Sequence, residues 1–114
     1  MHIDIKLRYR NDIIIPEEHK LIEHITRENN ASYLVKGYDN PEFPYLGEVE
    51  YNDPSVFDAN DMDAIIEELL CIRKEVINPG DQAHIDDIIR LAKKCKEIPD
   101  TVLTFSGHYE SIVK

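Results

Sequence analysis

The start of the chain alternates between apolar and polar residues, which is the period of two that predicts a half-buried β-strand, and the end of the chain also reads as strand. Residues 2–10 read "HIDIKLRYR", with apolar side chains at every second position and charged ones between them. Residues 101–106 read "TVLTFS", and a second short extended piece is expected over residues 109–114. We therefore expect strands at the two ends of the chain.

Two segments in the second half show the i, i+3, i+4 and i+7 spacing of an amphipathic helix. Residues 60–76 form the first, and Asp58 is a suitable cap for it, with Asp61 three residues later. The second is expected to be capped by Asp81 and to end before Pro99. The link "NPGD" is so short that the two helices are predicted to pack as an antiparallel hairpin.

The first half gives three further elements. Pro16 suits a first helical turn, and the two glutamates after it favour the positive end of the helix dipole, so residues 16–28 are predicted to be helical. Residues 32–38, "SYLVKGY", and residues 45–51, "YLGEVEY", read as strands, the second with one acidic face. Prolines make the segment between them a loop, and "NDP" turns the chain afterwards.

The order of these elements predicts one α+β domain. We expect an antiparallel or mixed sheet of four to five strands, with three helices packed on it. A chain of 114 residues is long enough to bury one core. It has neither an apolar run near twenty residues nor a basic start followed by an apolar stretch, so we expect no membrane span, no signal peptide and a cytoplasmic protein.

The charge is concentrated in one third of the sequence. From Gly37 to Ile72 there are ten acidic residues and no Lys or Arg, whereas the rest of the chain has 23 − 10 = 13 acidic residues against 13 basic ones. The whole net charge of −10 therefore belongs to this segment. Such clustering favours a positively charged partner, and it disfavours direct nucleic-acid binding, because phosphate contacts need Lys and Arg.

No pattern in the chain selects a catalytic or metal site. "DANDMD" from Asp58 fails as a calcium loop, since positions 6 and 12 are Asp63 and Leu69 instead of Gly and Glu. "FSGHYES" lacks the GxSxG spacing of a nucleophile, and the five histidines are scattered. Cys71 and Cys95 lack zinc-site spacing and are expected to be reduced, buried thiols. We expect no cofactor, no metal and no catalytic residue.

Residues 38–63 hold eight carboxylates and five of the nine aromatic rings of the chain. One interpretation is an interface in which rings supply contact area and acids supply steering, and the other is a core rim kept soluble by the acids. On the first interpretation, the candidate partner-binding residues are Tyr38, Asp39, Phe43, Tyr45, Glu48, Glu50, Tyr51, Phe57, Asp58, Asp61 and Asp63.

A small acidic α+β domain with such a segment resembles the immunity proteins of contact-dependent inhibition and other bacterial polymorphic toxin systems. "FDANDMDAIIEEL", residues 57–69, is also locally similar to the inhibitor helix of the barstar family. The resemblance implies a non-enzymatic immunity protein, a monomer or weak homodimer, that neutralises a cognate toxin, with a nuclease as the first expectation. The acids would then occupy a basic groove as phosphate mimics, with the aromatic residues as anchors.

Two other classes of protein stay open. The first is a small regulatory or adaptor protein that binds a basic partner or self-associates. The second is a small enzyme whose site the sequence does not reveal.

Overall fold

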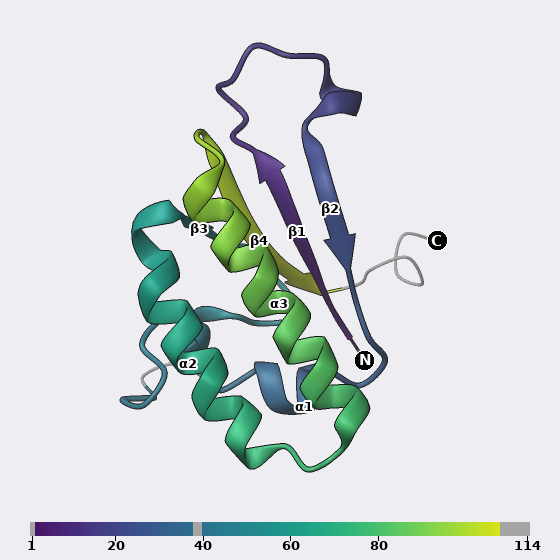
Figure 1. The fold of residues 1–114 in the computed structure, drawn as a ribbon, viewed down its shortest axis with the longest axis vertical. Helices are drawn as coiled ribbons and strands as arrows, with labels where there is room; N and C mark the ends of the chain where they lie inside the picture. Colours follow the sequence, from purple (N-terminus) through teal and green to yellow (C-terminus); the bar gives the residue numbers. More distant parts are fainter. Residues whose placement is uncertain (1, 38–39, 108–114) are drawn as a thin grey trace.

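The computed structural model describes residues 2–37 and 40–107 and shows one antiparallel four-stranded sheet (Figure 1). Its strands are β1 (Ile3–Tyr9), β2 (Leu21–Ile25), β3 (Ser55–Asp58) and β4 (Thr101–Gly107), in the order β2-β1-β4-β3. The helices are α1 (Ala31–Leu34), α2 (Met62–Glu75) and α3 (Pro79–Glu97). The predicted α+β class is thus confirmed, and the extended piece predicted over residues 109–114 lies outside the described residues.

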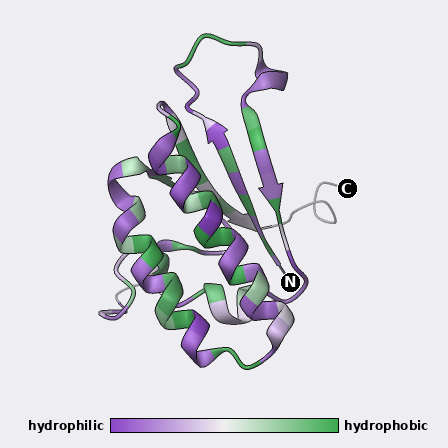
Figure 2. Ribbon diagram, in the orientation of Figure 1, coloured by the Kyte–Doolittle hydropathy of each residue, from purple (hydrophilic) through white to green (hydrophobic). Residues whose placement is uncertain are grey.

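The two central strands, β1 and β4, are the ones that the alternating pattern predicts. Ile5 lies opposite Phe105 and Leu7 lies opposite Leu103, and all four side chains are fully buried. Because side chains alternate across a strand, the polar residues between them face the other side of the sheet. The alternation of hydrophobic and hydrophilic residues is visible in Figure 2.

Helices α2 and α3 lie side by side on one face of the sheet (Figure 1). Two ion pairs join them, Asp63 with Lys96 and Arg73 with Asp86. Their apolar stripes are buried; the fully buried members are Met62, Ile65, Leu69, Ile72, Ile85, Ile88, Leu91, Ala92 and Cys95. Both helices are confirmed, and the antiparallel hairpin stays a prediction. Within the described part of the chain, no helix is both long enough and apolar enough to cross a membrane.

The predicted capping residue, Asp58, caps the short turn that leads into α2, whereas the N-cap of α2 itself is Asp61. The Asp58 carboxylate accepts a hydrogen bond from the backbone N–H of Asn60 at 2.9 Å. The Asp61 carboxylate accepts one from the backbone N–H of Asp58 at 3.1 Å, which completes a capping box. The box closes a 3₁₀ turn, η3 (Ala59–Asp61), that leads directly into the helix.

The predicted cap of α3 is wrong by three residues. The Asn78 side chain accepts from the backbone N–H groups of Gly80 and Asp81, and Pro79 occupies the first helical position. Proline is favoured there because its missing N–H has no partner inside the helix. Asp81 instead accepts a hydrogen bond from the Arg27 guanidinium at 2.7 Å.

The helix predicted over residues 16–28 is also wrong. Pro16 is followed only by a 3₁₀ turn, η1 (Glu17–His19), and the chain then enters β2. In β2, Ile25 lies opposite Ile5 of β1, and the pairing has an irregularity farther along the strand. The few apolar residues of this segment fit a helical stripe and a strand with a bulge equally well. Pairing with β1 therefore determines that the segment is a strand.

Both strands predicted beside the acidic segment are wrong. Tyr33 and Leu34 lie in the short helix α1 instead, and both are buried. Within residues 45–51 the structure has a 3₁₀ turn, η2 (Leu46–Glu48). A Cβ on Gly47 would come within 2.8 Å of the Gly37 carbonyl oxygen, so this turn packs directly against the preceding loop.

Candidate functional site

The acidic segment forms one continuous surface at the β3 edge of the sheet. The ring centroid of Tyr45 lies 6.3 Å from that of Phe57 on β3, and the Ser55 hydroxyl donates to the Glu48 carbonyl oxygen at 3.0 Å. Turn η2 and strand β3 therefore touch, and β3 runs directly into η3 and α2. We call the partly or fully exposed carboxylates on these elements the acidic surface: Glu48, Asp58, Asp61, Asp63 and Glu67.

One acid of the segment is buried and holds this surface together. Glu68 is 6% exposed, and its two carboxylate oxygens accept hydrogen bonds from the backbone N–H groups of Tyr45 at 3.1 Å and Leu46 at 2.8 Å. The N–H groups at the start of a helical turn have no acceptor within the turn, and the side chain of Glu68 on α2 accepts from them. Glu68 is one of the ten acids between Gly37 and Ile72, and its burial was not predicted from the sequence. Its place in the buried stripe, three residues after Ile65, was the signal that could have identified it.

Three predicted site residues lie where β3 passes into α2. Asp58 and Asp61 are bonded to backbone N–H groups in the capping box, and the Asp63 carboxylate pairs with Lys96 of α3. The structure brings these three carboxylates together. They have structural contacts of their own, so only part of their charge is available to a partner.

Two exposed acids of the segment form no ion pair within the part of the chain that the structure describes. Among the described residues, no Lys, Arg or His side chain forms an ion pair with Glu48 or Glu67, and both are exposed. The arginines are engaged by acids outside the segment; the pairs are Arg8 with Glu17, Arg10 with Asp12 and Asp100, Arg27 with Asp81, Arg73 with Asp86, and Arg90 with Glu23 and Asp87. Five of the ten acids that carry the excess negative charge of the chain therefore lie on the acidic surface, and one of these five, Asp63, is paired with Lys96.

The aromatic residues of the segment divide into two groups. Phe43 and Phe57 are each 4% exposed and belong to the core, where the Phe57 ring packs edge-on against Phe105 with centroids 5.8 Å apart. Tyr45 and Tyr51 are half-buried at the surface. Among the described residues, these two tyrosines are therefore the aromatic residues of the segment that a partner could contact. Tyr38 and Asp39 lie outside that part of the chain, and Glu50 is half-buried beside Tyr51.

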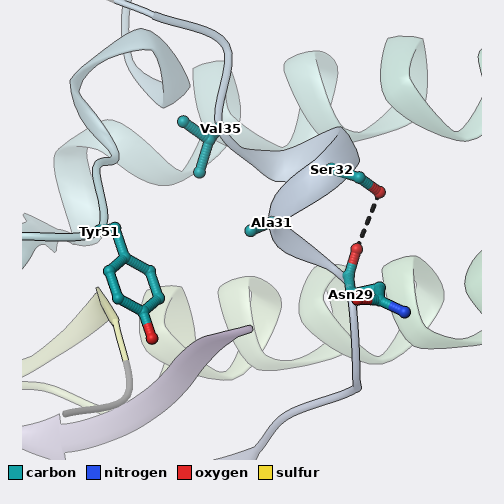
Figure 3. A pocket seen from close by; sticks show the side chains of 5 residues that line it. All are labelled: Asn29, Ala31, Ser32, Val35 and Tyr51. Atoms are coloured by element: carbon teal, nitrogen blue, oxygen red, sulfur yellow. Dashed lines mark hydrogen bonds between the residues drawn. The ribbon is translucent and has the colours of Figure 1, made fainter. Parts of the chain in front are cut away.

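A pocket of about 420 Å³ opens beside Tyr51 (Figure 3). Its other walls come from the start of α1 and the residues around it: Asn29, Ala31, Ser32 and Val35. Figure 3 shows the Tyr51 ring across the pocket from the Ala31 methyl group, with the Ser32 hydroxyl bonded to the Asn29 carbonyl oxygen at 2.8 Å. The pocket is mainly apolar and joins the acidic segment to a part of the chain that sequence reasoning did not connect with it.

A buried polar cluster ties α3 to the sheet. The Asn30 side chain is fully buried, accepts from the Ile3 N–H at 2.6 Å and donates to the Ile3 carbonyl oxygen at 2.9 Å. Its amide nitrogen also lies 3.1 Å from Nε2 of His84. Since an amide nitrogen only donates, Nε2 must accept, and the histidine is neutral with its proton on Nδ1. Burial, followed by the nearby charge of Arg27, lowers the pKa of His84.

The predicted positions that remain are the two cysteines and the segment "FSGHYES", of which residues 108–111 lie outside the described part of the chain. Both cysteines are free thiols; Cys95 is buried as predicted, whereas Cys71 is exposed on α2, against prediction. Within the residues that the structure describes, no group of three or more His, Cys, Asp or Glu side chains could hold a metal ion.

Comparison of the chain with models of protein families, with curated proteins and with solved structures found no match.

Proposed function

We propose that this protein is a non-enzymatic immunity protein, which binds and neutralises a basic toxin domain through the acidic surface. The observation that carries the proposal is the separation of charge in the folded chain. Arginines outside the segment are paired with acids outside the segment, whereas Glu48 and Glu67 form no ion pair with any described residue. A surface left with uncompensated carboxylates attracts a partner of opposite charge and accelerates encounter.

The fold supplies the rigidity that such a surface needs. The two hydrogen bonds of Glu68 hold η2 on α2, and the capping box fixes the turn between β3 and α2. Carboxylates that are already placed lose less entropy when a partner binds. Tyr45 and Tyr51 add half-buried rings beside the acids, which is the mixture of residues found at protein interfaces.

A nuclease is the first choice of toxin, because a groove that binds phosphate presents the Lys and Arg side chains that carboxylates can occupy. Glu48, Asp58, Asp61, Asp63 and Glu67 are the proposed phosphate mimics. Neutralisation by this mechanism requires occupancy of the groove and no chemistry from the immunity protein.

The test is binding to the product of the neighbouring upstream gene, in which we expect the toxin domain. The double variant Glu48→Gln/Glu67→Gln should lower the association rate constant by about 3- to 10-fold at low salt, and this difference should shrink at about 0.5 M salt. Stopped-flow fluorescence measures both rates. An unchanged association rate in the variant would show that the acidic surface does not steer this partner.

The matched control removes the same charge from the opposite edge of the sheet. Glu17 and Glu18 are exposed residues of η1, which precedes β2, and β2 and β3 are the two edge strands. The variant Glu17→Gln/Glu18→Gln changes net charge equally, and its association rate should stay within about 2-fold of the unmodified protein. An equal slowing in both variants would mean that net charge alone, and not the acidic surface, governs binding.

A further inference from the structure

We infer that a second pocket, between the first turns of α3 and the segment that follows β2, binds a small zwitterion of the amino-acid type. Its volume of about 320 Å³ admits a small molecule, and the charges on its walls select the ligand. The lining residues are Thr26, Arg27, Gly80, Ala83, His84 and Asp87.

This site is separate from the acidic surface. Asp63 of that surface pairs with Lys96 in the last turn of α3, whereas the second pocket lies beside the first turns of the same helix. The inference therefore does not rest on the proposed function, and either can fail without the other.

His84 brings to the pocket a hydrogen-bond donor that has no acceptor in the described part of the chain. The residue is 7% exposed, and its Nε2 accepts from the Asn30 amide, so the proton is on Nδ1. No described residue accepts from Nδ1–H, and yet no buried side-chain nitrogen or oxygen atom of those residues lacks a partner. Nδ1 is therefore reached from the pocket that His84 lines, and it offers its N–H to an occupant.

Arg27 supplies a positive charge beside this donor. Its Nε bonds to Asp81 at 2.7 Å, which uses only one of the N–H donors of the guanidinium group. Nη2 lies against the backbone of Gly80, because a Cβ atom built on Gly80 would collide with it. Gly80 and His84 are four residues apart and share one face of α3. Arg27 and His84 can therefore bind the two oxygens of one carboxylate.

Asp87 places a negative charge on the same face, one turn beyond His84. Its side chain is 55% exposed, and Arg90 approaches it only through Nε at 3.5 Å, because both terminal nitrogens of Arg90 bind Glu23. A ligand that is only an anion would be repelled by Asp87, and one that is only a cation would be repelled by Arg27. An amino acid carries a carboxylate and an ammonium group on one carbon atom, so it can satisfy both walls.

The experiment uses the whole ¹⁵N-labelled protein, with free glycine, acetate and methylammonium as probes. Free glycine should shift the imidazole NMR signals of His84 and the amide signal of Gly80 in a saturable manner. Acetate lacks the ammonium group and methylammonium lacks the carboxylate, so each should bind at least about 5-fold more weakly. Either probe binding as tightly as free glycine would overturn the assignment of a zwitterion, and shifts no larger at His84 and Gly80 than elsewhere would overturn the site.

Asp87→Asn tests the contact with the ammonium group. It should weaken the binding of free glycine at least about 5-fold without weakening that of acetate, because only a negative charge is removed. Asp86→Asn is the matched control, since Asp86 is the neighbouring exposed aspartate, pairs with Arg73 and does not line the pocket. Its affinity for free glycine should stay within about 2-fold of the unmodified protein. An equal loss in both variants would show that Asp87 has no direct contact with the ligand.

Gly80→Ala tests the contact with the carboxylate. The added methyl group displaces Nη2 of Arg27, so free glycine and acetate should both bind at least about 5-fold more weakly. Circular dichroism shows whether each variant is folded. Folded Asp87→Asn and Gly80→Ala variants that both bind free glycine like the unmodified protein would refute the inference.

Discussion

Replacement of Glu68 by Gln should destabilise the protein although only one oxygen is exchanged for an NH₂ group. Each carboxylate oxygen of Glu68 accepts from a different backbone N–H, those of Tyr45 and Leu46. Glutamine offers one acceptor oxygen and places a donor where the second oxygen stood. One of the two backbone N–H groups therefore loses its partner, in a position where Leu46 is fully buried.

The expected cost follows from these contacts. A hydrogen bond to a charged group contributes about 1.5–3 kcal/mol, so losing one of two should lower the free energy of unfolding by about 2 kcal/mol. With a typical urea dependence, the midpoint of unfolding should fall by about 1 M. Turn η2 should loosen as well, so the amide protons of Tyr45 and Leu46 should exchange with solvent faster than in the unmodified protein.

Glu67 provides the matched control for this measurement. It is the neighbouring glutamate on α2, it is exposed, and Glu67→Gln makes the same chemical and charge change. Urea unfolding followed by circular dichroism should show Glu67→Gln within about 0.5 kcal/mol of the unmodified protein. If Glu68→Gln proves equally stable, the two hydrogen bonds do not hold η2 in place, and the account of how the acidic surface is positioned is wrong.

Three further predictions concern other parts of the fold. Because the pKa of His84 is lowered in the folded state, the unfolded state binds more protons, so the free energy of unfolding should decrease as pH falls below about 6.5; His84→Gln should remove this part of the decrease, measured by urea unfolding at several pH values. Gly107→Ala should cost about 1–3 kcal/mol, because the new methyl group would collide with the Tyr51 backbone oxygen, and a thermal melt unchanged from the unmodified protein would contradict this. A thiol reagent should label exposed Cys71 at least about 100-fold faster than Cys95, whose pKa is raised by burial, and mass spectrometry of the Cys71→Ser variant should show almost no rapid labelling.

The elements that the sequence predicted correctly are those in which local pattern and tertiary contacts agree. β1 alternates over seven residues, β4 is rich in strand-forming residues, and the two pair with each other, so their apolar faces form one buried layer. α2 carries its apolar stripe over four turns and begins at a capping box that is visible in the sequence. In these segments, a long periodic pattern leaves little room for another structure.

The elements that the sequence predicted wrongly are short ones decided by distant contacts. The apolar residues of β2 fit a helix or a strand, and its pairing with β1 across a long connection determines the outcome. The Asn30 side chain bonds to Ile3, 27 positions away, and this contact fixes the chain just before α1. No local window of the sequence contains such contacts, so propensity alone cannot resolve them.

The candidate site was predictable in its charge and unpredictable in its geometry. The count of acids between Gly37 and Ile72 places the excess charge correctly, since it needs no knowledge of the fold. Burial decides which residues of the segment face outward, and it moves Phe43, Phe57 and Glu68 into the interior. An aromatic residue such as Phe57 is common both in a buried core and at a protein interface, so its presence in the sequence does not tell the two apart.

The acids of the segment therefore have two different uses, and this division determines which variants can test a function. Glu68 and the capping pair Asp58 and Asp61 are bonded to backbone N–H groups, so changing them alters the fold together with the charge. Glu48 and Glu67 have no such bonds through their side chains among the described residues, so changing them alters the charge alone. A loss of toxin binding on neutralising the first group would not distinguish a displaced surface from a discharged one. The second group makes that distinction, because its variants should keep the stability of the unmodified protein while they slow association.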